Sequence, residues 1–510
     1  METQGLSFNG GHIALPRGLV DKRGQRRLAP FAESDAASEC HTEDVGGTTP
    51  RTASSVFTRA HGCPDDPILG VRDAFLADPA VNKLNLAVGV YRTEDGQPFV
   101  LETVQEAEVA LLAEQRAGRS NKEYLAPSGM SAFCDASLRL LFADTLAPAL
   151  AEHRVVAAQS LSGLGGLHLA GKMIGELMAP GTTIYVPETT WPLHPDIFGE
   201  LGFRVATYPY YDATTCGLDF HAMINALNAL PRGSVVLLHA CAHNPSGVDP
   251  TQQQWDAIAA AVGAQGLVPL LDSAYQGFAS GDLHTDGYGA RALAAVPGVE
   301  MFVCQSYAKN MGLYGERAGC FTMVCSDADV AERARQQLCR CIRLIYSSPP
   351  RHGAAIVTKV LTESARRDAW QAEVAGMASR LRAMRVALDA ALTRIQCPPP
   401  HGTTLSGWQH VLSQRGMFTY TGLTAQQVDW LRTEHHIYMP ADGRICMACL
   451  NDASCDTLAL AIKQSFSLFE PHGAVEDATD AKASPSSSVG TPACTAATTD
   501  EQPATKRPRK

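Results

Sequence analysis

Short apolar runs, bounded by Gly, Pro and polar residues, recur along the chain. Their length and composition predict buried strands. They cover residues 84–91, 182–186, 235–239, 266–271, 301–304 and 319–324. Helical periodicity is expected over about 164–178, from about residue 327 to the 341–350 segment, and over about 357–395. These elements indicate an open α/β sheet, a fold that collects ligands at the ends of its strands.

A single lysine stands just past one of these runs. Lys309 follows the run 301–304, and Arg317 lies eight residues further on. Burial and a neighbouring cation lower the pKa of a lysine, so that its neutral amine can attack a carbonyl carbon. The same pattern in isolation also fits a surface lysine in a loop that contains glycine.

A carboxylate and an indole also follow predicted strands. Asp272 comes directly after the run 266–271, where a buried carboxylate needs a partner charge; taken alone, it could instead cap a helix. Trp191 follows the run 182–186 and could either fill the core or stack on a planar ring.

A glycine-rich turn over residues 159–169 opens the helix expected at 164–178. Free amide hydrogens and the positive end of the helix dipole make such a turn a site for an anion, and Ser162 adds a hydroxyl. Gly89 would allow a backbone amide to approach a ligand, although a bend alone would explain it. His239 and His243 would share a face only on a helix, which Pro245 interrupts, so no metal site is predicted.

The composition restricts the class of protein. The 510 residues include 18% charged side chains and carry a formal net charge of −10, which argues against binding to nucleic acid. No apolar run reaches the ~18 residues of a membrane helix. The 15 cysteines lie mostly in apolar segments, which favours reduced thiols in a reducing compartment.

Five segments together resemble the class I aminotransferases, and the aspartate aminotransferases in particular. They are the Asp-Pro-Ile-Leu-Gly string at 66–70, the Asn-Leu-x-Val-Gly-Val-Tyr string at 85–91, Trp-Pro-x-His at 191–194, His-Asn-Pro-Ser-Gly at 243–247, and the lysine segment 306–319. The resemblance covers about residues 64–468. It implies a fold type I transferase dependent on pyridoxal phosphate, with a mainly parallel sheet sandwiched by helices and a smaller α+β domain.

The resemblance also implies a role for each site residue. Pyridoxal 5′-phosphate would be bound as an imine on Lys309, with Asp272 on its ring nitrogen, Trp191 stacked on its ring, and Asn244 and Tyr275 on its phenol oxygen. His194 would orient Asp272, and His239 would lie behind the site. The phosphate group would be held by Ser162, Gly163, Leu164, Ser306 and Arg317, and by Tyr124 of a neighbouring subunit. Substrate would meet Gly89, Trp191, Asn244, Arg444 on its α-carboxylate, and Arg343 from the neighbouring subunit on its distal carboxylate.

Two of these residues have ordinary alternatives. Tyr124 could be an aromatic packed at a helix end, and Arg343 could only complement a helix dipole. With the resemblance, the expected reaction is the reversible ping-pong transamination between L-aspartate and 2-oxoglutarate, giving oxaloacetate and L-glutamate, in a homodimer that binds neither nucleic acid nor membrane. An aromatic-amino-acid transaminase or a lyase of the same fold remains open, as does a non-catalytic descendant.

The chain departs from the family pattern at four positions. Leu164 stands where threonine is usual, Gly315 where asparagine is usual, and Cys446 and Cys449 where asparagine and glycine are usual. A strand is expected over 444–450, so the two cysteines are interpreted as substitutions rather than as a zinc or redox site.

Five segments are expected along the chain. Residues 1–63 form a disordered extension, 64–99 an arm and part of the small domain, 100–365 the large cofactor-binding domain, 366–468 the rest of the small domain, and 469–510 a disordered tail. A cytoplasmic location is expected. A transit peptide in the basic N-terminal segment and a nuclear signal at residues 506–510 are the alternatives.

Overall fold

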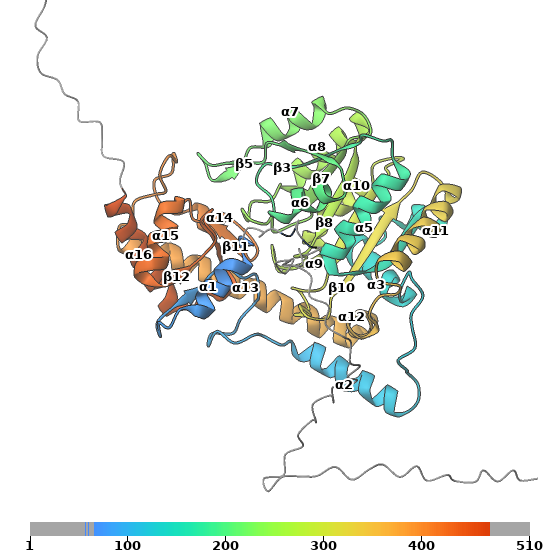
Figure 1. The fold of residues 1–510 in the computed structure, drawn as a ribbon, viewed down its shortest axis with the longest axis horizontal. Helices are drawn as coiled ribbons and strands as arrows, with labels where there is room; N and C mark the ends of the chain where they lie inside the picture. Colours follow the sequence, from blue (N-terminus) through green and yellow to red (C-terminus); the bar gives the residue numbers. More distant parts are fainter. Residues whose placement is uncertain (1–56, 58–59, 61–65, 470–510) are drawn as a thin grey trace, which may run out of the picture. The chain divides into compact units, whose positions relative to one another are not determined.

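The computed structural model describes Phe57, Ala60 and residues 66–469 (Figure 1). The expected extensions at 1–63 and 469–510, with their targeting signals, therefore lie almost wholly outside the described residues. The unit that begins at Asp65 holds all the helices and strands of the described residues. None of its described helices combines the length and apolar character needed to cross a bilayer.

A seven-stranded sheet forms the centre of this unit, with the strand order β2-β10-β9-β8-β7-β3-β4. Only β10 runs antiparallel to its neighbours. The strands are β2 (Val155–Leu161), β3 (Thr183–Pro187), β4 (Arg204–Tyr208), β7 (Val235–His239), β8 (Val268–Ser273), β9 (Met301–Ser306) and β10 (Ala318–Val324). The strands β7, β9 and β10 are buried at every residue, which agrees with the mainly apolar runs that identified them.

Helices cover both faces of this sheet and bury separate apolar clusters. One cluster lies under α5 (Ser162–Leu177), α6 (Leu193–Glu200) and α11 (Ala328–Ile345). The opposite cluster lies under α3 (Ser131–Phe142), α7 (Phe220–Ala229), α8 (Gln252–Gln265) and α10 (Tyr288–Ala294). Short elements complete this part: α4 (Ala147–Ala151), α9 (Leu283–Asp286), and the hairpin of β5 (Tyr211–Asp212) and β6 (Gly217–Leu218).

A second group of elements joins residues from both ends of the described chain. The two-residue strands β1 (Leu84–Asn85) and β12 (Ile437–Tyr438) pair in parallel, and β11 (Phe418–Tyr420) pairs antiparallel with β13 (Arg444–Cys446). The helices of this group are α1 (Leu69–Ala77), α13 (Ser364–Arg394), α14 (His410–Ser413), α15 (Ala425–His435) and α16 (Asp452–Leu468). A third apolar cluster, which includes the fully buried Trp370 of α13, fills the space beneath them.

Three sequence expectations were wrong in detail. The strand predicted over 84–91 is ordered as a strand only at β1. The strand predicted over 444–450 ends at Cys446 and continues as a 3-10 turn, Met447–Cys449. The single long helix expected over 357–395 is two helices, α12 (Arg351–Thr362) and α13.

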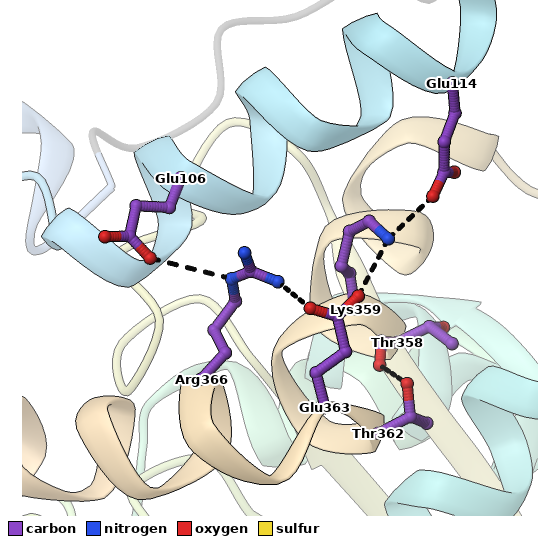
Figure 2. Close-up of polar contacts among 7 residues, drawn as sticks. All are labelled: Glu106, Glu114, Thr358, Lys359, Thr362, Glu363 and Arg366. Atoms are coloured by element: carbon purple, nitrogen blue, oxygen red, sulfur yellow. Dashed lines mark hydrogen bonds and ion pairs between the residues drawn. The ribbon is translucent and has the colours of Figure 1, made fainter. Parts of the chain in front are cut away.

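The break between α12 and α13 falls at Glu363, whose backbone is extended. Lys359 Nζ contacts Glu363 Oε1 at 2.8 Å from one side, and Arg366 pairs with the same carboxylate from the other. Figure 2 shows these charges facing α2 (Glu102–Arg116), where Glu114 lies 2.7 Å from Lys359 Nζ and Glu106 lies 3.8 Å from Arg366 Nε. Because Glu363 pairs with a cation on each helix, the break is stabilised by charge, which hydrophobic periodicity does not reveal.

Candidate active site

A cavity of about 240 Å³ opens where β7, β8 and β9 end, beside the first turn of α5. Its lining unites most of the residues expected from the sequence. They are Gly89, Ser162, Gly163, Leu164, Trp191, His239, Asn244, Asp272, Tyr275, Ser306, Lys309, Arg317 and Arg444. The strand ends thus collect the candidate groups as an open α/β sheet should.

Lys309 lies in the turn that follows β9. Its Nζ is 4.8 Å from the centre of the Tyr275 ring, and among the described residues no carboxylate lies within ion-pair distance of it. Burial, assisted by the charges of Arg317 and Arg444 and opposed by that of Asp272, lowers the pKa of Lys309 to about 8. A substantial fraction of this amine is therefore neutral, and nucleophilic, near pH 8.

Asp272 lies within β8 and points one oxygen into the cavity. His194 Nε2 contacts its Oδ2 at 3.1 Å, whereas its Oδ1 is buried with no hydrogen-bond partner. Burial alone would raise the pKa of Asp272, but the hydrogen bond from His194, helped by the positive charge of Lys309, outweighs burial and lowers that pKa. The carboxylate is thus held ionised with a free acceptor, which suits a protonated ring nitrogen.

Thr190 joins the two histidines behind Asp272, a role that the sequence did not suggest. Its Oγ1 lies 2.8 Å from His194 Nδ1 and 3.2 Å from His239 Nε2. Burial lowers the pKa of His239 to about 3, so its ring is neutral. The backbone N–H of Asn244 donates to His239 Nδ1 at 3.4 Å, so the proton of the neutral ring is on Nε2. Thr190 then accepts from His239 and donates to His194 Nδ1, which leaves His194 Nε2–H directed at Asp272.

The first turn of α5 supplies the anion-binding side of the cavity. Ser162 has a positive φ of 60°, and its Oγ lies 2.8 Å from Ser306 Oγ. Gly319 makes room for this turn, because a Cβ on Gly319 would lie 2.6 Å from the Ser162 backbone. Arg317 is exposed beside the cavity and donates to Tyr314 O at 3.0 Å. Two hydroxyls, a guanidinium and unpaired helix amides therefore converge on one place.

Arg444 closes the opposite side, supported by the second group of elements. Its Nη1 donates to Asn244 Oδ1 at 3.2 Å and its Nη2 to Ala87 O at 2.6 Å, while its Nε is buried without a partner. Phe418 lies under the guanidinium at 4.2 Å and would also meet a Cβ on Gly89 at 2.7 Å. The close approach of the Phe418 ring therefore favours a glycine at position 89. Phe418 is a site residue that only the structure reveals.

A family model described as Aminotransferase class I and II matches residues 81–462 of the chain. The chain belongs to this family. The fold type I architecture, the enzyme class of pyridoxal-phosphate-dependent aminotransferases and the cofactor expected from the sequence are confirmed.

The similar proteins are mainly aspartate aminotransferases. The chain is 46% identical to the cytoplasmic aspartate aminotransferase of Oryza sativa subsp. japonica, over 80% of this chain and 98% of the relative. It is 45% identical to the chloroplastic aspartate aminotransferase 3 of Arabidopsis thaliana, over 86% of this chain and 94% of the relative.

Two solved structures are also similar. An aspartate aminotransferase from the cytoplasm of Saccharomyces cerevisiae has a TM-score of 0.77 and 36% identity over 81% of this chain and 99% of that one. An aromatic amino acid aminotransferase from Burkholderia cenocepacia has a TM-score of 0.74 and 39% identity over the same shares of both chains.

The cavity fits the family's cofactor. The unpartnered Asp272 Oδ1 faces it, the α5 turn offers donors for a phosphate, and the neutral fraction of Lys309 can bond to an aldehyde carbon. Among the described residues, no group of three or more His, Cys, Asp or Glu side chains could hold a metal ion.

Three expected site residues do not line this cavity. His194 lies behind Asp272, as its expected orienting role requires. Tyr124 is 85% exposed, and Arg343 is exposed near the end of α11, where it donates to Ser347 Oγ. Within the described part of a single chain, these last two contact neither Lys309 nor Arg444.

Proposed function

We propose that the protein is an aspartate aminotransferase that moves an amino group reversibly between L-aspartate and 2-oxoglutarate in two successive half-reactions. The observation that carries this proposal is one cavity holding the Lys309 amine, the free Asp272 oxygen and the Arg444 guanidinium. These groups match the three parts of the chemistry, which are proton transfer, charge stabilisation and recognition of a carboxylate.

Each side chain has a definite task in this proposal. Bound pyridoxal phosphate supplies an electron sink for negative charge at the substrate Cα. Asp272 would keep the proton on the ring nitrogen of the cofactor, and the relay through Thr190 and His194 keeps Asp272 ionised and oriented. Lys309 Nζ would take the Cα proton of the amino acid as a general base and would then give it up as a general acid.

The remaining cavity residues position the two molecules. Ser162, Gly163, Leu164, Ser306 and Arg317 would hold the phosphate, although Leu164 offers only its backbone amide. Trp191 would lie against the ring, and Tyr275 and Asn244 would bind its phenol oxygen. Arg444 would hold the substrate α-carboxylate through its planar, permanently charged guanidinium.

We infer a homodimer with shared active sites. Tyr124 at 85% exposure and Leu344, beside Arg343, at 74% exposure leave an aromatic, an aliphatic and a cationic side chain unburied on one chain. A second copy would bury them and bring Arg343 to the distal carboxylate and Tyr124 to the phosphate of the opposite cavity. Dicarboxylic substrates are proposed on this ground.

The proposed division into domains uses the same elements. Residues 100–365 would form the large domain, and residues 64–99 with 366–468 the small one, since β1 from one end of the described chain pairs with β12 from the other. Arg444 belongs to the small domain, so closure of the two domains would complete the substrate site. A cytoplasmic location is proposed.

Absorbance spectra would test this function. Purified protein with pyridoxal phosphate is recorded before and after addition of L-aspartate, L-phenylalanine or L-tyrosine. We expect L-aspartate to convert the lysine-bound cofactor to its amine form far more readily than either aromatic amino acid, and Lys309→Ala to lose the lysine-bound absorbance and the activity together. Preferential conversion by an aromatic amino acid would move the assignment to an aromatic transaminase, the function named for one similar structure.

A further inference from the structure

Cys446 and Cys449 lie in a turn, which changes what two thiols at this spacing can do. In the strand expected over 444–450, residues three apart would point to opposite faces. Instead β13 ends at Cys446, and Met447–Cys449 forms a 3-10 helix with Cys446 as its N-cap. Side chains three apart are eclipsed in a 3-10 helix, which brings two cysteines into the range that a disulfide needs.

The two thiols contact each other. The adjacent Cys449 thiol lowers the pKa of Cys446, with help from the charge of Arg444, although burial opposes this shift. The same contact, with burial, raises the pKa of Cys449, and Arg92 lies close enough to interact with its sulfur. A thiolate stabilised by a neighbouring thiol and by an arginine is the form of cysteine that reacts with oxidants.

The pair has no further ligand for a metal. Within residues 66–469 no third Cys, His, Asp or Glu side chain is placed to complete a metal site with it. Cys446 is fully buried, and Cys449 is partly exposed. The arrangement is therefore that of a dithiol in which only Cys449 is partly exposed to solvent.

The pair is joined to the segment that lines the substrate end of the cavity. Cys449 Sγ donates to Val88 O at 3.6 Å and lies 3.9 Å from Val90 O, on either side of Gly89. The Cys446 amide donates to Leu86 O at 2.9 Å. Arg444, two residues before Cys446, donates to Ala87 O at 2.6 Å.

We propose that Cys446 and Cys449 form a reversible disulfide that weakens substrate binding at Gly89 and Arg444. The disulfide takes Cys449 Sγ away from the carbonyls of Val88 and Val90 and ties it to the end of β13. The segment 86–90 then loses a side-chain contact on each side of Gly89, while the groups that hold the cofactor, Lys309 and Asp272, are untouched.

Formation of the disulfide from two thiols requires an oxidant, and we name a peroxide as its chemical class. The thiolate of the pair attacks one peroxide oxygen, the O–O bond breaks, and a sulfenic acid forms; the hydroxide that leaves takes up a proton from solvent and becomes water. The neighbouring thiol then attacks the sulfenic sulfur, the S–S bond forms, and a second water leaves with the remaining proton. Exchange with an external dithiol reverses the reaction and returns both protons.

The experiment treats full-length protein, carrying its cofactor, with hydrogen peroxide and then with dithiothreitol. Blocking of free thiols and peptide mass spectrometry before and after reduction report which cysteines are joined. Kinetics with L-aspartate and 2-oxoglutarate are measured on the same samples. We expect a Cys446–Cys449 disulfide, about a tenfold rise in KM from the lost hydrogen bonds, unchanged cofactor absorbance, and full recovery after reduction.

Two variants make the result specific. Cys449→Ser keeps a hydroxyl beside Val88 O but cannot form the bond, so its KM should not respond to peroxide. Cys339→Ser, which removes a partly exposed thiol of α11, should respond as the unmodified protein does. A peroxide effect that persists in Cys449→Ser would overturn the proposal.

The proposal would also fail if the surface thiols oxidise while Cys446 and Cys449 stay reduced, or if the disulfide forms and KM is unchanged. Its kinetic part rests on the proposed function, but the mass-spectrometric part does not. Absence of aspartate turnover in the untreated protein would refute the function, whereas absence of the disulfide in an active protein would refute only the inference.

Discussion

Thr190→Val tests the relay behind Asp272, because valine keeps the shape of threonine and removes only the hydroxyl. His194 Nδ1 and His239 Nε2 then lose their shared partner, and both rings are buried, since these residues are 0% and 7% exposed. An orphaned buried donor or acceptor costs about 1–3 kcal/mol. Two of them should lower the free energy of unfolding by about 2–6 kcal/mol.

The same substitution should weaken catalysis. His194 would no longer be fixed with its Nε2–H on Asp272 Oδ2, and burial would then raise the pKa of Asp272 without full opposition. Loss of one hydrogen bond to a charged group is worth about 1.5–3 kcal/mol, or about ten- to hundredfold in kcat/KM. Steady-state kinetics with L-aspartate from pH 5 to 9 would measure this loss, which should be largest at low pH, where Asp272 becomes protonated.

Controls separate the relay from a general effect of removing a threonine hydroxyl. Thr182 is half-buried and its hydroxyl makes a local bond to Ala179 O at 2.7 Å, so Thr182→Val should stay within about 0.5 kcal/mol of the parent in urea unfolding. Thr190→Ser retains the hydroxyl and should keep most of the activity. If Thr190→Val unfolds and turns over like Thr182→Val, the proton arrangement deduced for the two histidines is incorrect.

Three further outcomes are expected. Arg444→Lys keeps the charge but loses the planar pair of donors, so kcat/KM for L-aspartate should fall by about ten- to hundredfold; a change below about threefold would remove Arg444 from substrate binding. In protein freed of cofactor, the rate of pyridoxal phosphate capture should rise with pH and level off above about 8, because burial lowers the pKa of Lys309 from 10.5 to about 8; a rate still climbing above pH 10 would contradict this. Lys359→Met should lower stability by about 1 kcal/mol or less, since Glu363 is half exposed. Because ion pairing lowers the pKa of Glu363, that contribution should be present above the usual glutamate pKa and lost as pH falls through the lowered value. If Lys359→Met lowers the free energy of unfolding as much in 1 M salt as at low salt, the loss of stability does not come from charge.

Sequence periodicity located the central strands closely but misplaced elements at the edges. β7 and β10 were predicted within a residue because every position in them is buried, so their apolar runs are unbroken. The short strands β1 and β13 owe their pairing to partners far away in the chain, and local pattern carries little information about them. The break at Glu363 is accompanied by ion pairs to both flanking helices, and these have no hydrophobic signature.

The sequence predicted most of the groups that line the cavity, because Lys309 and Trp191 follow strands, Asp272 lies near the end of one, and strand ends meet at one edge of a sheet. Only the tertiary structure decided how the groups connect. Thr190 carries no motif, yet it bridges two histidines 45 residues apart in the chain, since 239 − 194 = 45. Cys446 and Cys449 would be separated on a strand and are joined by a turn. Side-chain identity and spacing are local properties that a sequence holds, whereas the approach of groups from distant segments depends on packing, which exists only in the folded chain.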